Sequence, residues 1–285
     1  MRIVIIGANG QLGSDLSIAL SKYKPICLTH KDVEVADFRI VNKIFRKYRP
    51  EILINTAAFH NVALCEKEPL KAFMVNAVGV KYLAENCLYY KTVLVHFSTD
   101  YIFDGKKKRP YIEEDYPSPL NVYGISKLAG EYFIQYILKK YFIIRTSAMF
   151  GVHLCRAKGG NFIDTMLRLY KEKKEIKVVK DEITSPTYSL DLAKQVKELI
   201  TTSHYGIFHI SGHGFCSWYD FAKTIFKFLN IKVKIEPVEA KKFCPEVRRP
   251  PFSALENKHL KILGLDRMRP WQEALKDYLK KKKLI

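Results

Sequence analysis

Residues 2–13 read Arg-Ile-Val-Ile-Ile-Gly-Ala-Asn-Gly-Gln-Leu-Gly, a short apolar run followed by glycines in the pattern GxxGxxG. The apolar run predicts a buried strand, and residues 11–22 predict a helix that begins directly after it. Glycines at 7, 10 and 13 let the backbone bend sharply and approach a pyrophosphate at the N-terminus of that helix. An ordinary tight turn is the alternative, but a strand before and a helix after the glycines favour a phosphate-binding turn.

The same rhythm of apolar strands and amphipathic helices continues through the first half of the chain. Five such alternations predict an α/β fold, a doubly wound parallel sheet that binds a dinucleotide. The strands are expected at residues 2–6, 25–29, 51–55, 92–97 and 141–145, and the helices at 11–22, 38–48, 69–90 and 123–139. After residue 150 the rhythm breaks, with helices expected at 161–171 and 218–229. We therefore expect a dinucleotide-binding domain at 1–150, with later segments at about 185–205 packing back on it, and a smaller α/β substrate-binding lobe at 151–285.

Composition places the chain among folded globular proteins. Its 285 residues are 48% hydrophobic, which suits one large domain or two intimate ones. A net charge of +19 attracts anions, but no nucleic-acid-binding module is visible, so most of the lysines are interpreted as solvated surface. The six cysteines form no CxxC pair, which argues against a disulfide framework or a metal site. No run approaches the ~18 apolar residues of a membrane span, and a cytoplasmic protein is expected.

The end of the second predicted strand bears on the cofactor. An acidic residue usually stands there to bind the ribose 2′-hydroxyl of NAD, whereas this chain has Leu28-Thr-His-Lys31. His30 and Lys31 favour a 2′-phosphate and hence NADPH, with NADH as the alternative because Asp32 follows directly.

A second group of residues suggests carbonyl chemistry. Tyr123-Gly-Ile-Ser-Lys127 places a phenol and an ammonium on one face of a helix, and the lysine charge is expected to lower the pKa of the phenol. Thr99 ends the fourth predicted strand, where the side chains of an α/β sheet face ligands. Its hydroxyl could bond a substrate carbonyl beside the phenol, although a turn or capping role is the alternative.

With these residues in view, the chain resembles the dTDP-4-dehydrorhamnose reductase family of extended short-chain dehydrogenases/reductases, which have an NAD(P)-binding Rossmann fold. The resemblance spans nearly the whole chain. Its motifs are Gly7–Gly13, Asp37-Phe38, Arg49-Pro50, Asn55-Thr-Ala-Ala58, Ser98-Thr-Asp-Tyr-Ile-Phe-Asp-Gly105, Pro119 to Glu131, Arg145-Thr-Ser147, Asn161-Phe162, Ser185-Pro-Thr187, Arg249-Pro250 and Pro270-Trp271.

The resemblance implies a role for each matching residue. Tyr123 would donate the proton, Lys127 would assist it and bind the nicotinamide ribose, and Thr99 would hydrogen-bond the carbonyl. The cofactor would contact Gly7, Asn9, Gly10, Gln11, Leu12, Gly13, His30, Lys31, Asp37, Phe38, Ala57, Ala58, Phe59, Tyr123 and Lys127. The substrate, a dTDP-sugar, would contact Thr99, Asp100, Asn161, Arg248 and Arg249.

The resemblance implies NAD(P)H-dependent reduction of a 4-keto-6-deoxy sugar, dTDP-4-dehydro-L-rhamnose first among them, and it is compatible with a homodimer. Three departures leave the sugar open: Ala148 where the family often has Trp, Ala63 where it usually has Asp, and a longer loop at 151–160. The alternatives are a sugar-nucleotide epimerase, a reductase of another keto sugar, and a non-catalytic NADP-binding subunit like that of methionine adenosyltransferase. A nucleic-acid-associated protein is the weakest interpretation.

Overall fold

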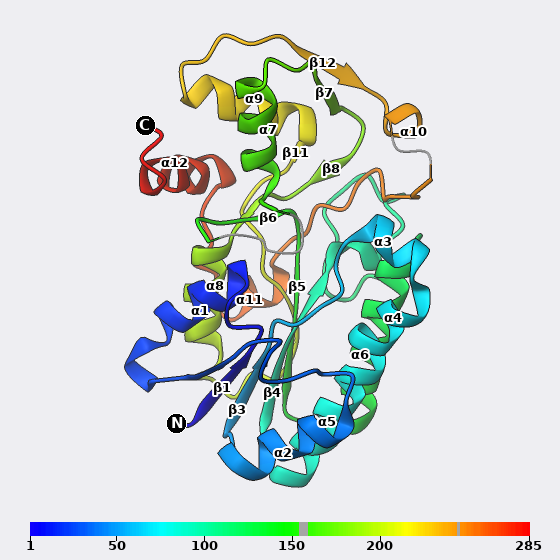
Figure 1. Cartoon of the computed structure of the whole chain (residues 1–285), viewed down its shortest axis with the longest axis vertical. Coiled ribbons are helices and arrows are strands. Elements are labelled where there is room, and N and C mark those ends of the chain that lie inside the picture. The colour runs from blue at the N-terminus through cyan, green and yellow to red at the C-terminus, as the bar shows by residue number, and fades with distance from the viewer. Residues whose placement is uncertain (154–158, 244–245) are drawn as a thin grey trace.

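The computed structural model describes residues 1–153, 159–243 and 246–285, and a six-stranded sheet lies at its centre (Figure 1). The strand order is β10-β5-β4-β3-β1-β2, and every neighbouring pair is parallel. The predicted doubly wound sheet is therefore confirmed. Its strands are β1 (Ile3–Ile6), β2 (Ile26–Leu28), β3 (Ile52–Asn55), β4 (Val93–Thr99), β5 (Tyr141–Thr146) and β10 (Gly206–His209).

Helices cover both faces of the sheet (Figure 1). Alternate residues of β1 enter two separate cores, Ile3 and Ile5 one core and Val4 and Ile6 the other. Burial on both faces explains why this strand is a continuous apolar run rather than an alternating one. One face is covered by α1 (Gln11–Ala19), α8 (Ser189–Leu199) and α11 (Lys258–Ile262), the other by α2 (Phe38–Tyr48), α5 (Gly79–Tyr90) and α6 (Val122–Ile137).

Two elements from beyond residue 185, α8 and β10, belong to the layers of the central sheet. Helix α8 packs against α1, and β10 pairs with β5 at the edge of the sheet. The sheet therefore contains a strand from beyond residue 200, and the division of the chain at residue 150 stays a prediction.

A smaller α/β part lies beyond one end of the sheet (Figure 1). Aromatic residues dominate one of its cores, where the rings of Phe150 and Tyr188 stack and Tyr278 meets both of them edge-on. Its elements are β6 (Met149–Phe150), α7 (Phe162–Lys171), β7 (Ile176–Val179), β8 (Ile183–Thr184), β9 (Thr187–Tyr188), β11 (Cys216–Ser217), α9 (Trp218–Phe228), β12 (Ile235–Val238), α10 (Ala240–Phe243) and α12 (Trp271–Lys281).

The single helix predicted for residues 69–90 is divided in the structure. A π-helical turn, η2 (Met74–Val78), separates α4 (Pro69–Phe73) from α5, and π turns often occur at functional sites. The turn contains Asn76, whose amide bonds both the N–H and the carbonyl of Phe59. A π turn contains one residue more than an α-helical turn, and the spacing of apolar residues in the sequence does not reveal that extra residue. The other short helices are α3 (Val62–Lys67), η1 (Ser21–Tyr23) and η3 (Asp100–Ile102).

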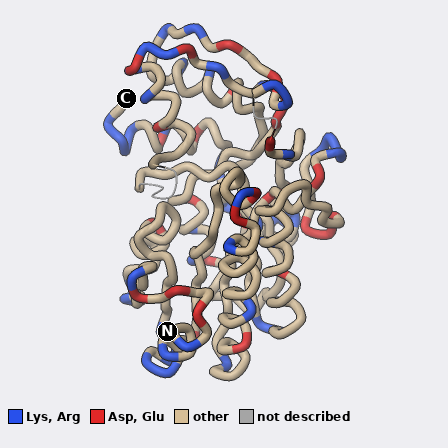
Figure 2. Tube along the Cα trace, turned by 45° about the vertical axis from the view of Figure 1, so that its right-hand side comes forward, with Lys and Arg blue, Asp and Glu red and all other residues tan. Residues whose placement is uncertain are grey.

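The basic residues are spread over the molecule. Lys and Arg lie at both ends and along the helices, mixed with Asp and Glu (Figure 2). Within the described part of the chain, no helix combines the length and apolar character that a membrane span needs. Among the described residues, the cysteines at 27, 65, 87 and 216 form no disulfide, and those at 155 and 244 lie outside the described part of the chain.

Candidate active site

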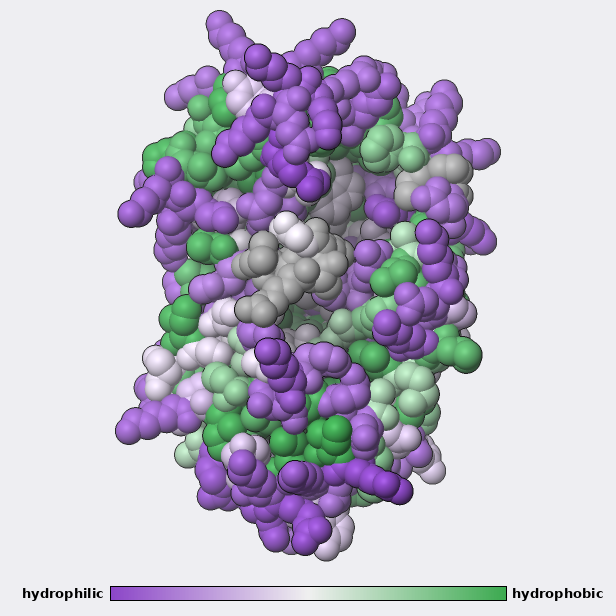
Figure 3. All heavy atoms as spheres, viewed as in Figure 1, coloured by the Kyte–Doolittle hydropathy of each residue, from purple (hydrophilic) through white to green (hydrophobic). Residues whose placement is uncertain are grey.

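A cavity of about 1220 Å³ lies between the sheet and the smaller part of the protein. The surface is hollowed at this level in Figure 3. Sites for one drug-sized ligand have roughly 300–1,000 Å³, so this cavity has room for a dinucleotide and a second ligand. Residues from the ends of β1, β3, β4 and β5 line it, which is where ligands bind in open α/β sheets.

The glycine turn forms one end of the cavity. Gly7 has a φ of +79°, and a Cβ on Gly13 would lie 2.2 Å from the carbonyl oxygen of Gly7. Side chains at these two positions would therefore destroy the turn. Gly10 is the N-cap of α1, and no side chain in the described part of the chain caps this helix, so its first amides remain available to a phosphate. All the predicted contacts here line the cavity: Gly7, Asn9, Gly10, Gln11, Leu12 and Gly13.

The loop after β2 places two cationic side chains at the cavity. His30 and Lys31 both line it. Asp32 does not, because its Oδ2 accepts hydrogen bonds from the Thr29 amide (2.7 Å) and hydroxyl (2.8 Å). These bonds, the one from the amide foremost, also hold the pKa of Asp32 below its usual range. One oxygen of this carboxylate is thus bonded within its own loop.

Two residues predicted to contact adenine, Asp37 and Phe38, make contacts within the protein, and their contact with adenine stays a prediction. The Asp37 carboxylate caps α2 by accepting from the Arg39 (2.8 Å) and Ile40 (3.2 Å) amides. The Phe38 ring meets Tyr82 edge-on at 5.4 Å and is 46% exposed. Asp37 and Phe38 are absent from the described cavity wall.

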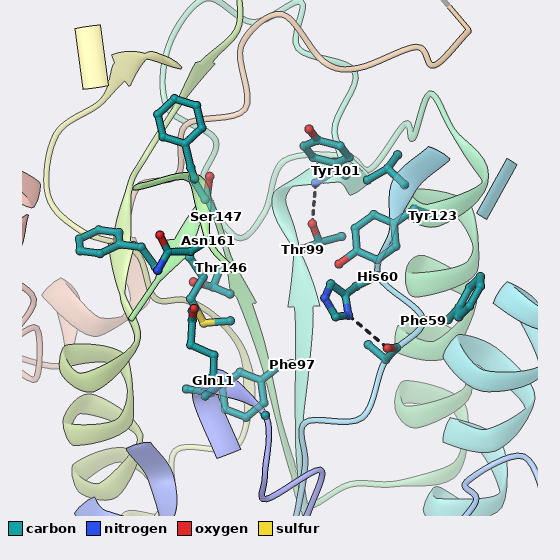
Figure 4. A pocket seen from close by; sticks show the side chains of 18 of the residues that line it. Gln11, Phe59, His60, Phe97, Thr99, Tyr101, Tyr123, Thr146, Ser147 and Asn161 are labelled. Carbon is teal, nitrogen blue, oxygen red and sulfur yellow. Dashed lines mark hydrogen bonds between the residues drawn. The ribbon is translucent and has the colours of Figure 1, made fainter. Parts of the chain in front are cut away.

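The segment after β3 forms the inner wall of the cavity. Ala57, Ala58 and Phe59, which are predicted to contact the cofactor, line it together with His60. Figure 4 shows Phe59 and His60. Asn76 holds the Phe59 backbone through two hydrogen bonds of 2.9 Å, which gives this wall a defined shape.

Thr99, Tyr123 and Lys127 converge beside this wall. Thr99 ends β4, and Tyr123 and Lys127 lie one turn apart on α6. A Cβ on Gly124 would lie 2.2 Å from the Tyr101 carbonyl oxygen, so glycine lets α6 approach the segment after β4. In Figure 4 the hydroxyls of Thr99 and Tyr123 point toward the same space.

The electrostatics of the phenol differ from the prediction. Burial raises the pKa of Tyr123 well above its usual value, and a hydrogen bond with Thr99 offsets this only in part. The Lys127 amine is directed to the Phe97 carbonyl oxygen (2.5 Å) and to Nε2 of His96 (3.1 Å). The expectation that Lys127 keeps this pKa low is therefore wrong for this structure. A phenol with a raised pKa stays protonated at neutral pH and can serve as a proton donor.

Asp100 lies on the cavity wall inside a cluster of hydroxyls. Its Oδ2 accepts from Ser253 (2.5 Å) and Ser147 (2.9 Å), and its Oδ1 accepts from Thr99 (3.1 Å). Burial raises the pKa of this carboxyl to about 6, although the three hydroxyls oppose the shift. Asp100 therefore ties Thr99 to Ser147, which directly follows β5, and to Ser253.

Asn161 lines the opposite wall, but its amide is fully used within the protein. Its Oδ1 accepts from the Ile163 and Asp164 amides at the start of α7. Its Nδ2 donates to the Gly151 carbonyl and the Tyr278 hydroxyl. An amide has two donor hydrogens and two acceptor lone pairs, so this side chain has no hydrogen-bonding group left for a substrate.

The predicted arginine pair is divided. Arg249 lines the cavity, whereas Arg248 is exposed, is absent from the described wall, and accepts a hydrogen bond from Asn121 on its carbonyl (2.9 Å). Ala148 also lines the cavity, with a φ of +41°.

Several wall residues were missed from the sequence. Ser147 stands in a quoted motif without an assigned role, while Glu182 and Ser253 gave no local signal. Ser253 meets Asp100 from 153 residues away, a contact that only the tertiary fold creates.

This sheet and this site together define a nicotinamide-dependent reductase of the extended short-chain dehydrogenase/reductase class. The model of the RmlD substrate binding domain matches residues 1–284, and the chain belongs to that family. The resemblance found in the sequence is thus confirmed.

Relatives and solved structures agree over nearly the whole length. The chain is 40% identical to the spore coat polysaccharide biosynthesis protein SpsK of Bacillus subtilis, covering 99% of this chain and 98% of the relative. It is 37% identical to a dTDP-4-dehydrorhamnose reductase of Aggregatibacter actinomycetemcomitans, covering 97% of each. The crystal structure of the Bacillus anthracis dTDP-4-dehydrorhamnose reductase in complex with NADP superposes with a TM-score of 0.93 at 39% identity, covering 98% of this chain and 99% of that one.

Proposed function

We propose that this protein uses NADPH to reduce the 4-keto group of a dTDP-linked 6-deoxy sugar, with dTDP-4-dehydro-L-rhamnose as substrate and dTDP-L-rhamnose as product. The observation that carries the proposal is that the Thr99 and Tyr123 hydroxyls face one space in a cavity that ends at the glycine turn. The relatives named dTDP-4-dehydrorhamnose reductase support the choice of sugar.

The residues present fit a dinucleotide. Cβ atoms at Gly7 and Gly13 would fill the turn, and the amides that begin α1 would bind the pyrophosphate. His30 and Lys31 would bind a 2′-phosphate, since Asp32 is bonded to Thr29. The NADP in the Bacillus anthracis relative supports this choice. When bound, the reduced nicotinamide supplies a hydride to the carbonyl carbon.

The protein's own residues would manage the carbonyl oxygen. The Thr99 hydroxyl would turn its single hydrogen from Oδ1 of Asp100 to this oxygen and donate a hydrogen bond to it. The Tyr123 phenol would transfer its proton to the same oxygen as negative charge develops. The raised pKa of Tyr123 keeps that proton available. Asp100 would orient Thr99, and Arg249 would bind the diphosphate with its guanidinium.

Reduction of another keto sugar is the second candidate. Ala148 supports it, because the small side chain in the cavity wall leaves space where the family often has the ring of a tryptophan. The same reaction would then act on a sugar with a different ring shape.

The test is the loss of reduced-nicotinamide absorbance with dTDP-4-dehydro-L-rhamnose generated in situ, with NADPH and NADH run side by side. Tyr123→Phe should lower kcat by at least about 10²-fold, the contribution of a positioned general acid. Tyr132→Phe, which removes a half-exposed hydroxyl from the same helix, is the matched control and should retain activity.

The outcomes separate the alternatives. Substrate turnover without net cofactor consumption would indicate an epimerase. Oxidation only with other dTDP-keto sugars would support the second candidate. Cofactor binding without turnover of any keto sugar would contradict the proposal and favour a regulatory subunit.

A further inference from the structure

Glu182 is a buried glutamate on the cavity wall that the proposed mechanism does not use. It lines the cavity and is 7% exposed. Burial raises the pKa of its carboxyl, and the charge of Arg249 opposes that shift. Within the described part of the chain, the carboxylate accepts no hydrogen bond. Since a buried carboxylate is costly without donors, its oxygens are suited to the hydroxyls of a ligand in the cavity.

Backbone hydrogen bonds fix one side of Glu182. The Ile183 N–H donates to the Pro251 carbonyl (2.9 Å), and the Ser253 N–H donates to the Ile183 carbonyl (2.8 Å). These bonds hold residue 182 beside the segment that carries Arg249, which also lines the cavity. Glu182 therefore lies near the guanidinium that would bind the diphosphate.

The next residues of the same segment lead to the carbonyl site. Thr184 follows Glu182 by two residues, so both side chains lie on one side of this extended segment, about 6–7 Å apart along it. The Thr184 and Ser147 hydroxyls are 2.6 Å apart, and Ser147 donates to Asp100. Asp100 also holds Thr99, which would bind the carbonyl. Glu182 thus lies on the wall between the carbonyl end of the site and the diphosphate end.

The shape of a 4-keto pyranose matches these two ends. Its C4 carbonyl lies across the ring from C1, the carbon that carries the diphosphate. C2 and C3 form one edge of the ring between them and each carries a hydroxyl, which can donate a hydrogen bond. The other edge consists of C5, with its methyl group, and the ring oxygen, and it has no hydrogen to donate. A carboxylate beside the ring therefore matches the edge formed by C2 and C3.

We propose that Glu182 is a specificity-determining residue, whose two carboxylate oxygens accept hydrogen bonds from the C2 and C3 hydroxyls and select sugars that carry both. This rests on the proposed function, because it takes the carbonyl to be at Thr99 and the diphosphate at Arg249. A sugar without the C2 hydroxyl leaves one buried oxygen without its donor. Sites built to bond a hydroxyl discriminate strongly against an analogue that lacks it.

The test is calorimetric titration of the whole protein with dTDP-L-rhamnose, its 2-deoxy counterpart and dTDP. NADPH is present throughout, because a reduced cofactor cannot react with an alcohol. The wild type should bind dTDP-L-rhamnose roughly 10- to 100-fold more tightly than the 2-deoxy sugar, as expected for a hydrogen bond to a charged group. In Glu182→Ala this preference should nearly disappear, while the affinity for dTDP is retained.

Two results would overturn the assignment. One is equal affinity of the wild type for the two sugars, or an undiminished preference in Glu182→Ala. The other is a loss in Glu182→Ala that is as large for dTDP as for the sugars, which would show that Glu182 only positions Arg249 for the diphosphate.

These titrations need no turnover, so they are independent of the assay for the proposed function. The preference can be absent from a protein that reduces the ketone, and it can be present in one that does not. A protein that binds none of the three ligands would contradict both proposals.

Two further variants separate contact from charge. Glu182→Gln keeps the shape and one acceptor oxygen, so it should keep part of the preference. Asp181→Asn is the matched control, because it removes a negative charge from the adjacent exposed residue and keeps an oxygen for the Ala240 N–H. It should leave the preference unchanged. An equal effect of both variants would assign the preference to net charge and contradict a direct contact of Glu182 with the sugar.

Discussion

Asp32 is bonded to Thr29 through one carboxylate oxygen, which accepts from both the amide and the hydroxyl of that residue. One carboxylate oxygen of the residue that could have bound a ribose 2′-hydroxyl is therefore engaged by its own loop. His30 and Lys31, the neighbours of Asp32 in this loop, line the cavity instead.

The first prediction concerns cofactor preference. Lys31→Ala should weaken NADPH binding about tenfold and leave NADH binding nearly unchanged, because a lysine bonds a phosphate through a charge-assisted contact. Calorimetric titration of both cofactors measures this. Lys43→Ala, an exposed lysine of α2, is the control for net charge. An equal loss for both cofactors would show that Lys31 does not recognise the 2′-phosphate.

The second prediction concerns Thr99. Thr99→Val keeps the shape and removes the hydroxyl, so kcat should fall by roughly 10²–10³-fold, as for loss of one oxyanion donor. Thr99→Ser retains the donor and should keep most of the activity. Steady-state kinetics of both variants tests this. If Thr99→Val were as active as the wild type, Thr99 would have only the turn or capping role and would not bind the carbonyl.

The third prediction concerns the glycine turn. Gly13→Ala would place a Cβ 2.2 Å from the Gly7 carbonyl oxygen, whereas in Gly10→Ala the same contact is 3.3 Å. The first variant should lose about 1–3 kcal/mol of unfolding free energy through overpacking, together with cofactor binding. Gly10→Ala should lose less unfolding free energy and less cofactor affinity than Gly13→Ala. Urea unfolding and cofactor titration compare them, and similar losses would contradict the steric argument.

The fourth prediction concerns Asp100 and pH. Its folded pKa of about 6 lies above the usual value of 3.8, so the folded protein binds this proton more tightly than the unfolded chain. The resulting stability is present at low pH and is lost as the pH rises from about 4 to 6, by about 3 kcal/mol at most. The unfolding free energy of Asp100→Asn relative to wild type should therefore rise over this range.

Asp104→Asn provides the opposite sign as a control. The Lys106 amide donates to Asp104 and lowers the pKa of its carboxyl, so that group adds stability as the pH rises. A difference between Asp100→Asn and wild type that does not change with pH would show that Asp100 titrates normally.

The sequence by itself determined the sheet, the glycine turn and the position of the tyrosine and lysine on one helix face. These features depend on local physics. A strand buried on both faces must be apolar throughout, a turn with positive φ and close packing must be glycine, and residues four apart on a helix are neighbours. Each can be recognised without knowing what lies on the other side of the cavity.

Only the tertiary structure decided how the polar groups are used. Asp32, Asp37 and Asn161 are residue types that bind ligands, yet each is bonded to nearby backbone, and Arg248 points to solvent. Conversely, the side chains of Asn55 and His96 lie 41 residues apart in the sequence and meet only through strand register. Each polar group can form only as many hydrogen bonds as its hydrogens and lone pairs allow. Long-range packing determines which groups in the protein form those bonds.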